Sequence, residues 1–184
     1  MVSGHIGLLQ SDKTDLKRKC VAYALEEMGG VAEKVGVFFA AETGMESATL
    51  MKELLVGLRT ESVRVNYDPA NLVMGAGDDP VAGVGTLADY IVHVHAKDGV
   101  KKGFWSPADL QAAISEKGTD SVRFDDWFTE TPFGEGHVDV ERFIGALAEI
   151  GYDGFLTVER EAAESPLEDI VAARDTIRDI LGGL

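Results

Sequence analysis

The sequence is poor in cysteine, in basic residues and in long apolar runs. The single Cys20 excludes an internal disulfide, and its place in a helical pattern predicts a small buried hydrophobic residue rather than a reactive thiol. One cysteine suits a reducing compartment, so we expect a cytoplasmic protein. No apolar run approaches the roughly 20 residues of a membrane-spanning helix, and no signal-peptide order is present at the N-terminus. We therefore expect no membrane partner.

Basic residues are outnumbered by acidic ones. The 17 Lys and Arg residues stand against 32 Asp and Glu residues, which gives a net charge of -15. This charge repels polyphosphate backbones and anionic membrane surfaces, so we expect no nucleic-acid partner.

The composition that remains is that of a globular protein. A chain of 184 residues with 45% hydrophobic content can bury a core, and it predicts one domain over 1–184. Short apolar runs alternate with amphipathic helical patterns, which predicts an α/β fold of about five parallel strands covered on both faces. The expected strands are 2–9, 35–44, 62–68, 91–98 and 154–159, and the expected helices are 15–28, 48–58, 80–87, 106–118, 140–151 and one that begins at Ser165.

Two segments carry more specific expectations. In the first helix one helical stripe predicts the buried face, and it consists of Leu16, Cys20, Tyr23, Ala24 and Met28. The alternation is interrupted by an insertion at about 99–137, in which 118–136 is expected to be loop. Its aromatic residues either wall a small-molecule pocket or pack under a long loop, and they are Trp105, Trp127, Phe128 and Phe133.

Four expected strands end in a residue that can bind a metal: Glu42, Asp68, His95 and Glu159. Open doubly wound sheets and (β/α)8 barrels both place ligands at the carboxyl ends of parallel strands. A buried carboxylate is costly unless it is paired, hydrogen-bonded or metal-bound. Taken singly, each residue would suit a helix cap or an ion pair. Together they favour one divalent ion, Mn²⁺, Mg²⁺ or Co²⁺, with Zn²⁺ as a further candidate.

The stretch Ile91 to Asp98, IVHVHAKD, places His93, His95 and Lys97 on one face of a strand. His93 suits a hydrogen-bonded core position better than a ligand position. Lys97 either reaches a substrate oxygen or balances the carboxylates. His5 ends the first expected strand. We expect these flanking residues, His93, Lys97 and His5, to lie around a bound substrate.

Five motifs in this order, ETG, NYDPANL, HVHAKDG, GEGHVD and ALAEIGYDGFLTVERE, resemble the sugar phosphate isomerase/epimerase family with the xylose-isomerase-like TIM barrel. The resemblance implies that Glu42, Asp68, His95 and Glu159 bind one divalent metal. It also implies that Glu42 and Glu159 exchange the substrate proton, with an enediolate between them. Epimerase relatives often carry His three residues after the metal-binding Asp, where this sequence has Asn71, and we expect Asn71 to contact the substrate.

The resemblance also implies a partial (β/α)8 TIM barrel, because a complete barrel needs about 250 residues. This sequence resembles the C-terminal part, and roughly three strand-helix units are lacking. Open strand edges expose unpaired backbone groups. We expect a homo-oligomer to close them. The alternatives are closure by a second polypeptide and a fragment of marginal stability.

The leading functional hypothesis is a metal-dependent isomerase or epimerase that acts on a small sugar or polyol by proton transfer next to a carbonyl. A keto-inositol dehydratase would use the same metal and base. An endonuclease IV-like nuclease is disfavoured, because four histidines are too few for a trinuclear zinc cluster and the net charge repels DNA. A non-catalytic relative that binds a sugar or a metal is the remaining alternative.

Overall fold

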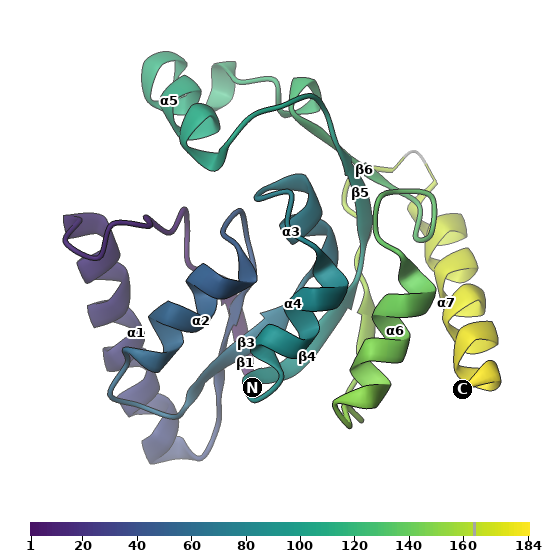
Figure 1. Cartoon of the computed structure of the whole chain (residues 1–184), viewed down its shortest axis with the longest axis horizontal. Coiled ribbons are helices and arrows are strands. Elements are labelled where there is room, and N and C mark those ends of the chain that lie inside the picture. The colour runs from purple at the N-terminus through teal and green to yellow at the C-terminus, as the bar shows by residue number, and fades with distance from the viewer. Residues whose placement is uncertain (164) are drawn as a thin grey trace.

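The computed structural model describes residues 1–163 and 165–184, and its centre is a parallel sheet of five strands in the order β1-β2-β3-β4-β7 (Figure 1). A separate antiparallel ribbon is formed by β5 and β6. The strands are β1 (Val2–His5), β2 (Phe39–Glu42), β3 (Val63–Tyr67), β4 (Ile91–Ala96), β5 (Asp98–Lys101), β6 (Phe128–Thr131) and β7 (Leu156–Val158). The α-helices are α1 (Leu16–Val35), α2 (Ala48–Val56), α3 (Pro69–Met74), α4 (Pro80–Leu87), α5 (Pro107–Lys117), α6 (Val140–Glu149) and α7 (Pro166–Gly183), with short 3-10 turns at Thr119–Ser121 and Phe124–Asp126.

Helices cover one face of the sheet, and the apolar core lies between them and the strands. On β3, Val63, Val65 and Tyr67 alternate toward the helices and are fully or almost fully buried. The Tyr67 ring stacks on Phe143 of α6 at a centroid distance of 5.9 Å, and its hydroxyl donates to the carbonyl of Pro80 at 2.6 Å. The opposite face of β3 carries the polar residues Arg64 and Asn66.

Short polar side chains begin most of the helices at the carboxyl ends of strands. Ser47 accepts from the backbone N–H of Leu50 at the start of α2, and Asp68 accepts from that of Asn71 at the start of α3. Proline occupies the first turn of α3, where its missing N–H costs nothing. None of the helices described is both long and apolar enough to cross a membrane.

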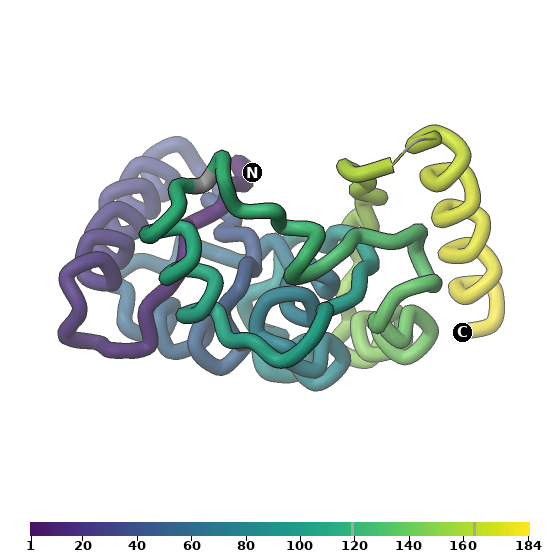
Figure 2. Tube along the Cα trace, turned by 90° about the horizontal axis from the view of Figure 1, so that it is seen from above, coloured from purple at the N-terminus to yellow at the C-terminus, as the bar shows by residue number. Residues whose placement is uncertain are grey.

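The five strands form an arc that stays open on one side (Figure 2). Parallel register brings the carboxyl ends of the strands to one edge, where His5 is level with Glu42, and Glu42 is level with Asn66. The arrangement is a half-barrel sheet with surrounding helices, which confirms the partial TIM barrel predicted from the sequence.

Two expectations were wrong, one inside the insertion and one just before it. Residues 118–136 were expected to be loop, but they contain β6, which pairs with β5. The strand expected over 91–98 ends at Ala96, and Asp98 opens β5 instead. Helix α3 was not predicted, because six residues are too few for a clear periodicity.

The buried face predicted for the first helix was also wrong. The buried residues of α1 are Arg18, Leu25, Gly29 and Ala32. Cys20 is exposed, and so are Leu16 and Tyr23, at 74% and 64%. The apolar stripe exists as the sequence indicates, but its residues are exposed.

Candidate metal centre

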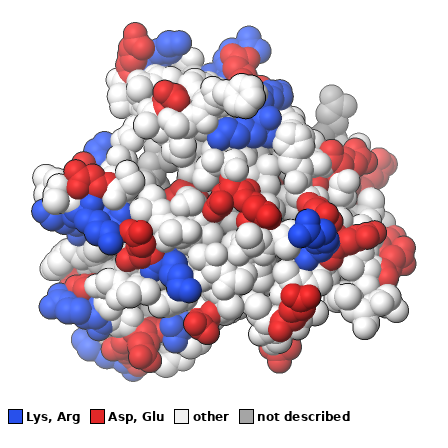
Figure 3. Space-filling view, viewed as in Figure 1, with Lys and Arg blue, Asp and Glu red and all other residues white. Residues whose placement is uncertain are grey.

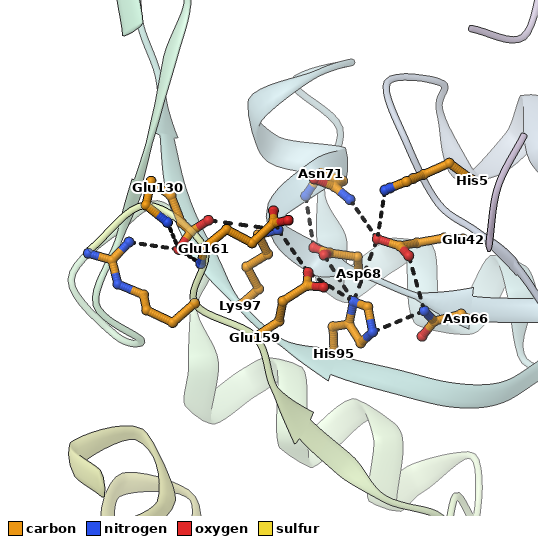
Figure 4. Close-up of polar contacts among 12 residues, drawn as sticks. His5, Glu42, Asn66, Asp68, Asn71, His95, Lys97, Glu130, Glu159 and Glu161 are labelled. Atoms are coloured by element: carbon orange, nitrogen blue, oxygen red, sulfur yellow. Dashed lines mark hydrogen bonds and ion pairs between the residues drawn. The ribbon is translucent and has the colours of Figure 1, made fainter. Parts of the chain in front are cut away.

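Four side chains from consecutive strands of the sheet converge at the carboxyl edge (Figure 4). One ligand atom from each of Glu42, Asp68, His95 and Glu159 lies within 4.8 Å of the other three. The first three residues are buried, and the side chain of Glu159 is 28% exposed. Glu42 ends its strand, Asp68 and Glu159 directly follow theirs, and His95 is the last residue but one of β4. Parallel pairing therefore brings the four together.

Hydrogen bonds fix the strand ends that carry Glu42 and Asp68. The Thr43 hydroxyl donates to the carbonyl of Asp68 at 3.0 Å and accepts from its N–H at 2.8 Å. One Asp68 oxygen caps α3, accepting from the N–H of Asn71 at 3.0 Å. The other oxygen, Oδ2, lies 3.4 Å from His95 Nδ1. Asp68 is thus both a helix cap and a candidate ligand. The two roles considered from the sequence, capping and metal binding, are compatible.

The imidazole of His95 lies in the middle of three carboxylates. Its Nδ1 atom is 3.2 Å from Glu159 Oε2 and 3.6 Å from Glu42 Oε1. Burial lowers the pKa of His95, but hydrogen bonds to Asp68, Glu159 and Glu42 outweigh it and raise the pKa to about 11. The carboxylates thus favour a positive charge at this point, and an imidazolium supplies it here.

The carboxylates respond to the same arrangement in opposite ways. Hydrogen bonds from His95 and then from Lys97 outweigh desolvation and lower the pKa of Glu159 to about 2. Asp68 is completely buried, and this desolvation raises its pKa despite its contact with His95. The site therefore keeps Glu159 ionised, and it holds Asp68 in a position where its carboxylate is not hydrated. Both properties suit a binding site for a hard cation.

The residues present fit a divalent ion. Three carboxylates and one imidazole are a donor set suited to Mn²⁺, Mg²⁺, Co²⁺ or Zn²⁺. A second observation concerns Asn66, whose amide nitrogen lies 3.1 Å from His95 Nε2 while its buried Oδ1 atom has no hydrogen-bond partner. If Nδ1 bound a metal, Nε2 would carry the ring proton and would need an acceptor. Rotation of the Asn66 amide by half a turn would bring Oδ1 to that proton.

Lys97 links the four ligand candidates to a second group of acidic residues. Its Nζ atom donates to Glu159 Oε2 and Glu161 Oε2, each at 2.8 Å, and lies 3.8 Å from Glu130 Oε2. Burial alone would lower the pKa of Lys97. The charge of Asp68 and the hydrogen bonds to Glu159 and Glu161 outweigh burial, so the pKa is raised above its ordinary value. Lys97 therefore balances the carboxylates in this structure, which is one of its two expected roles.

The other expected substrate contacts lie at different depths. Asn71 donates its amide to Glu42 Oε1 at 3.3 Å, and His5 Nε2 lies 3.7 Å from the same atom with a side chain that is 69% exposed. His93 lies deeper in the arc, where its Nε2 is 3.0 Å from Thr157 Oγ1 and its ring meets that of His95 edge-on at 5.7 Å. His93 thus contacts a ligand candidate without joining the four.

Two cavities flank the four ligand candidates. A cavity of about 410 Å³ is bounded by Lys97, Asn71, Glu130 and the aromatic residues Phe124 and Phe128. A cavity of about 230 Å³ lies on the other side, and its lining includes His5, Glu42, Gly44 and Asn71. Part of the aromatic insertion therefore does wall a cavity, while Phe133 packs against the core.

Sequence reasoning missed Asn66, Glu130 and Glu161. Asn66 shares the inward face of β3 with Asp68, so strict alternation two residues back from the strand end would have found it. Glu130 lies on β6, in the segment expected to be loop. Only the structure shows that this strand turns back toward β7, where Glu130 Oε1 accepts from Arg160 at 2.7 Å.

Comparison with known proteins places this geometry in context. The family model described as xylose isomerase-like TIM barrel matches residues 1–180. A curated protein named inosose dehydratase from Clostridium tetani (strain Massachusetts / E88) is 27% identical over 173 residues, which are 90% of this chain and 55% of that protein. The chain thus spans about half the length of the curated relatives it matches.

Solved structures show the same relationship. A xylose isomerase domain protein from Planctomyces limnophilus superposes with a TM-score of 0.77 at 26% identity, over 97% of this chain and 58% of that one. An IolI protein with a bound zinc atom superposes with a TM-score of 0.69 at 19% identity, over 99% of this chain and 63% of that one. At that identity the second likeness concerns the fold alone.

Proposed function

The chain belongs to the xylose isomerase-like TIM barrel family, and from that premise we propose that it is a divalent-metal-dependent enzyme of the isomerase and epimerase type. It would transfer a proton next to the carbonyl of a small sugar or polyol. The observation that carries the proposal is the convergence of Glu42, Asp68, His95 and Glu159 within 4.8 Å. A bound divalent ion would polarise the substrate carbonyl and stabilise the negative charge that develops on its oxygen.

The two glutamates are the groups that would move the proton. Glu159 is held as a carboxylate by His95 and Lys97, so it is in the ionised form that a general base needs to take a proton from the carbon beside the carbonyl. Glu42 comes from the other end of the set of four, and it would return a proton to the resulting enediolate. Asn71 and His5 both approach Glu42, so they would bind substrate oxygens on that side.

The surroundings favour an uncharged substrate rich in hydroxyl groups. Lys97, the cation nearest the larger cavity, is already shared among Glu159, Glu161 and Glu130. Acidic side chains are spread over the face drawn in Figure 3, with basic ones interspersed. A phosphorylated sugar would meet repulsion here, whereas hydroxyl groups can donate to the free carboxylate oxygens.

Dehydration of a keto-inositol is the second candidate, because curated relatives such as the Clostridium tetani protein are named inosose dehydratase. The first step is the same, since Glu159 would take a proton from the carbon beside the ketone. The enediolate electrons would then form a carbon-carbon double bond as the neighbouring C–O bond breaks. The hydroxide leaves as water after receiving a proton, for which the Lys97 ammonium is close to Glu159.

Proton exchange in D₂O tests both candidates. The Mn²⁺-loaded protein should introduce deuterium beside the carbonyl of a ketose or of an inosose, as detected by NMR. Return of the proton gives a deuterated ketose or its epimer, whereas dehydration gives a product lighter by one water. Glu159→Gln should abolish exchange, and Glu161→Gln, which alters an exposed carboxylate beside the same lysine, should retain it. Unchanged exchange in Glu159→Gln would contradict the proposed roles, and absence of Mn²⁺ binding would contradict the metal centre.

A further inference from the structure

We propose that Glu130 is a positioning residue, which holds the segment 159–163 so that Glu159 meets the other three ligand candidates. The inference rests on the proposed function, in which Glu159 takes the substrate proton. Glu130 lies on β6 of the ribbon, outside the sheet that carries the ligand candidates. In Figure 4 it lies beyond Lys97 as seen from His95.

The sheet itself gives little support to the segment that carries Glu159. Strand β7 ends at Val158, and the N–H of Glu159 donates to the carbonyl of Ala96 at 3.3 Å, longer than the usual range for such a bond. Residues 159–163 then continue without regular secondary structure. Because the ladder stops here, the position of the Glu159 carboxylate depends on side chains that hold the segment.

One oxygen of Glu130 accepts hydrogen bonds from three consecutive residues of this segment. Its Oε1 atom accepts from Arg160 Nη1 at 2.7 Å, from the N–H of Glu161 at 2.9 Å and from that of Ala162 at 3.4 Å. The side chains of Glu130 and Arg160 are only 7% and 10% exposed, so water competes little for these bonds. A charged acceptor strengthens each of them. Glu130 thus fixes the backbone directly after Glu159.

Attachment of the last helix is a simpler role for the same contacts. Arg160 Nε donates to Asp169 Oδ2 of α7 at 2.7 Å, so the guanidinium connects α7 with the ribbon. This role requires Arg160 and Asp169 alone. It does not account for the two backbone N–H groups that Glu130 accepts, whereas a positioning role for Glu130 does.

Balance of the Lys97 ammonium is the other alternative role for Glu130. Glu130 Oε2 lies 3.8 Å from Lys97 Nζ, while Glu159 and Glu161 each approach that atom to 2.8 Å. Glu130 is therefore the most distant of the three carboxylates, and its short contacts are those of Oε1. The two roles differ in what they require, because positioning needs an oxygen at the right reach and balance needs a negative charge.

Two conservative variants separate reach from charge. Glu130→Gln keeps the length of the side chain and an acceptor oxygen, whereas Glu130→Asp keeps the charge and shortens the side chain by one methylene. In Glu130→Asp, hydrogen exchange at the amides of Glu161 and Ala162 should accelerate at least about tenfold. Mn²⁺ affinity should fall about 10- to 100-fold. At saturating Mn²⁺, the kcat for deuterium entry into the substrate should fall about 10- to 100-fold while KM changes little.

Glu130→Gln should be less affected than Glu130→Asp in all three measurements. Arg160→Lys is a second test variant, because an ammonium cannot bond Glu130 and Asp169 as a guanidinium fork does, and it should shift Mn²⁺ affinity and kcat in the same direction as Glu130→Asp. Asp169→Asn is the matched control. It weakens the other 2.7 Å contact of Arg160 but leaves all three bonds to Glu130, so affinity and kcat should be retained.

The order of the variants decides the outcome. The proposal is overturned if Glu130→Gln loses as much as Glu130→Asp or more, since charge would then matter rather than reach. It is also overturned if Asp169→Asn loses as much as Glu130→Asp, since attachment of α7 would then explain the contacts. An unchanged protein that binds Mn²⁺ without exchanging deuterium would contradict the proposed function alone, because Mn²⁺ affinity and amide exchange test the positioning role without turnover.

Discussion

Nδ1 of His95 lies 3.2 Å from Oε2 of Glu159, and the two side chains come from neighbouring strands, β4 and β7. Strand β7 has only three residues and, within the described part of the chain, pairs with β4 alone. A metal held by both residues would tie this short edge strand to the buried carboxylates Glu42 and Asp68. Such a metal would couple its own binding to the order of the β7 edge.

Asp68→Asn should remove metal affinity without unfolding the protein. Asparagine caps a helix as well as aspartate does, so α3 keeps its start, and the buried charge is removed. We expect Mn²⁺ affinity to fall at least roughly 100-fold, while the free energy of unfolding of the metal-free protein stays within about 1 kcal/mol. Calorimetric titration and urea unfolding measure the two quantities.

The matched control for this experiment is Asp79→Asn. Asp79 caps α4 in the same way, accepting from the N–H groups of Val81 and Ala82, but it is exposed and lies outside the four ligand candidates. Its substitution should leave both affinity and stability unchanged. Equal losses of affinity in the two variants would refute a specific ligand role for Asp68.

Metal binding should release about one proton at neutral pH. The pKa of His95 is raised to about 11 in the metal-free protein, so the imidazole is protonated and must lose a proton before it can bind an ion. We therefore expect Mn²⁺ affinity to rise about tenfold for each pH unit between pH 7 and 9. Titrations in buffers of different ionisation enthalpy count the protons released. A count near zero would mean that His95 does not supply a ligand.

Asn66→Ala should weaken metal binding while leaving all four ligands in place. The amide nitrogen lies 3.1 Å from His95 Nε2, and after rotation of the amide its unpaired Oδ1 could accept from Nε2 and orient the ring for metal binding. Loss of such a partner costs about 10- to 100-fold in metal affinity. If affinity is unchanged and the proton count is the same, Asn66 has only a packing role.

The sequence predicted the positions of the four ligand candidates because each of them lies within one residue of the end of a strand, and strand ends meet at one edge of a parallel sheet. It did not predict Glu130, because β6 lies in a segment without regular alternation. The α1 stripe shows a different limit. Periodicity indicates which face of a helix is apolar, but not whether another element covers that face, and Leu16 and Tyr23 remain exposed.

Lys97→Met should change stability and metal affinity in opposite directions. Nζ of Lys97 lies 2.8 Å from Glu159 Oε2 and competes with a metal for that oxygen. Without the ammonium, the metal-free protein retains buried negative charge and should lose about 3 kcal/mol of stability. Mn²⁺ should bind about tenfold more tightly, because a cation next to its ligand is gone.

The control for Lys97→Met is Glu161→Gln, which breaks the other 2.8 Å contact of the same ammonium. Its carboxylate is 71% exposed, so its removal should cost less than about 1 kcal/mol. Urea unfolding with a chelator and calorimetric titration test both variants. A fall in both stability and affinity in Lys97→Met would show that the lysine organises the site rather than competes for it.

Asp98→Ala should destabilise the junction between the sheet and the ribbon. Asp98 is buried, and its carboxylate accepts from the backbone N–H groups of Gly99, Gly134, Gly136 and Val138 at 2.7–3.0 Å. The aspartate of HVHAKDG thus holds the GEGHVD loop, which explains two motifs by one contact. Loss of the carboxylate leaves buried donors unpaired, so we expect a cost of about 3 kcal/mol or more.

The size of this effect can be separated from any effect on the metal centre. Asp125→Ala changes an exposed aspartate of the same insertion and should cost less than about 1 kcal/mol. Both variants keep the four ligand candidates, so Mn²⁺ affinity should stay within about threefold of the unchanged protein as long as the protein is folded. Because β5 begins at Asp98 directly after Lys97, hydrogen exchange in Asp98→Ala should accelerate first in 98–101 and 128–138. Equal stability of the two aspartate variants would show that the loop is held by its own backbone contacts instead.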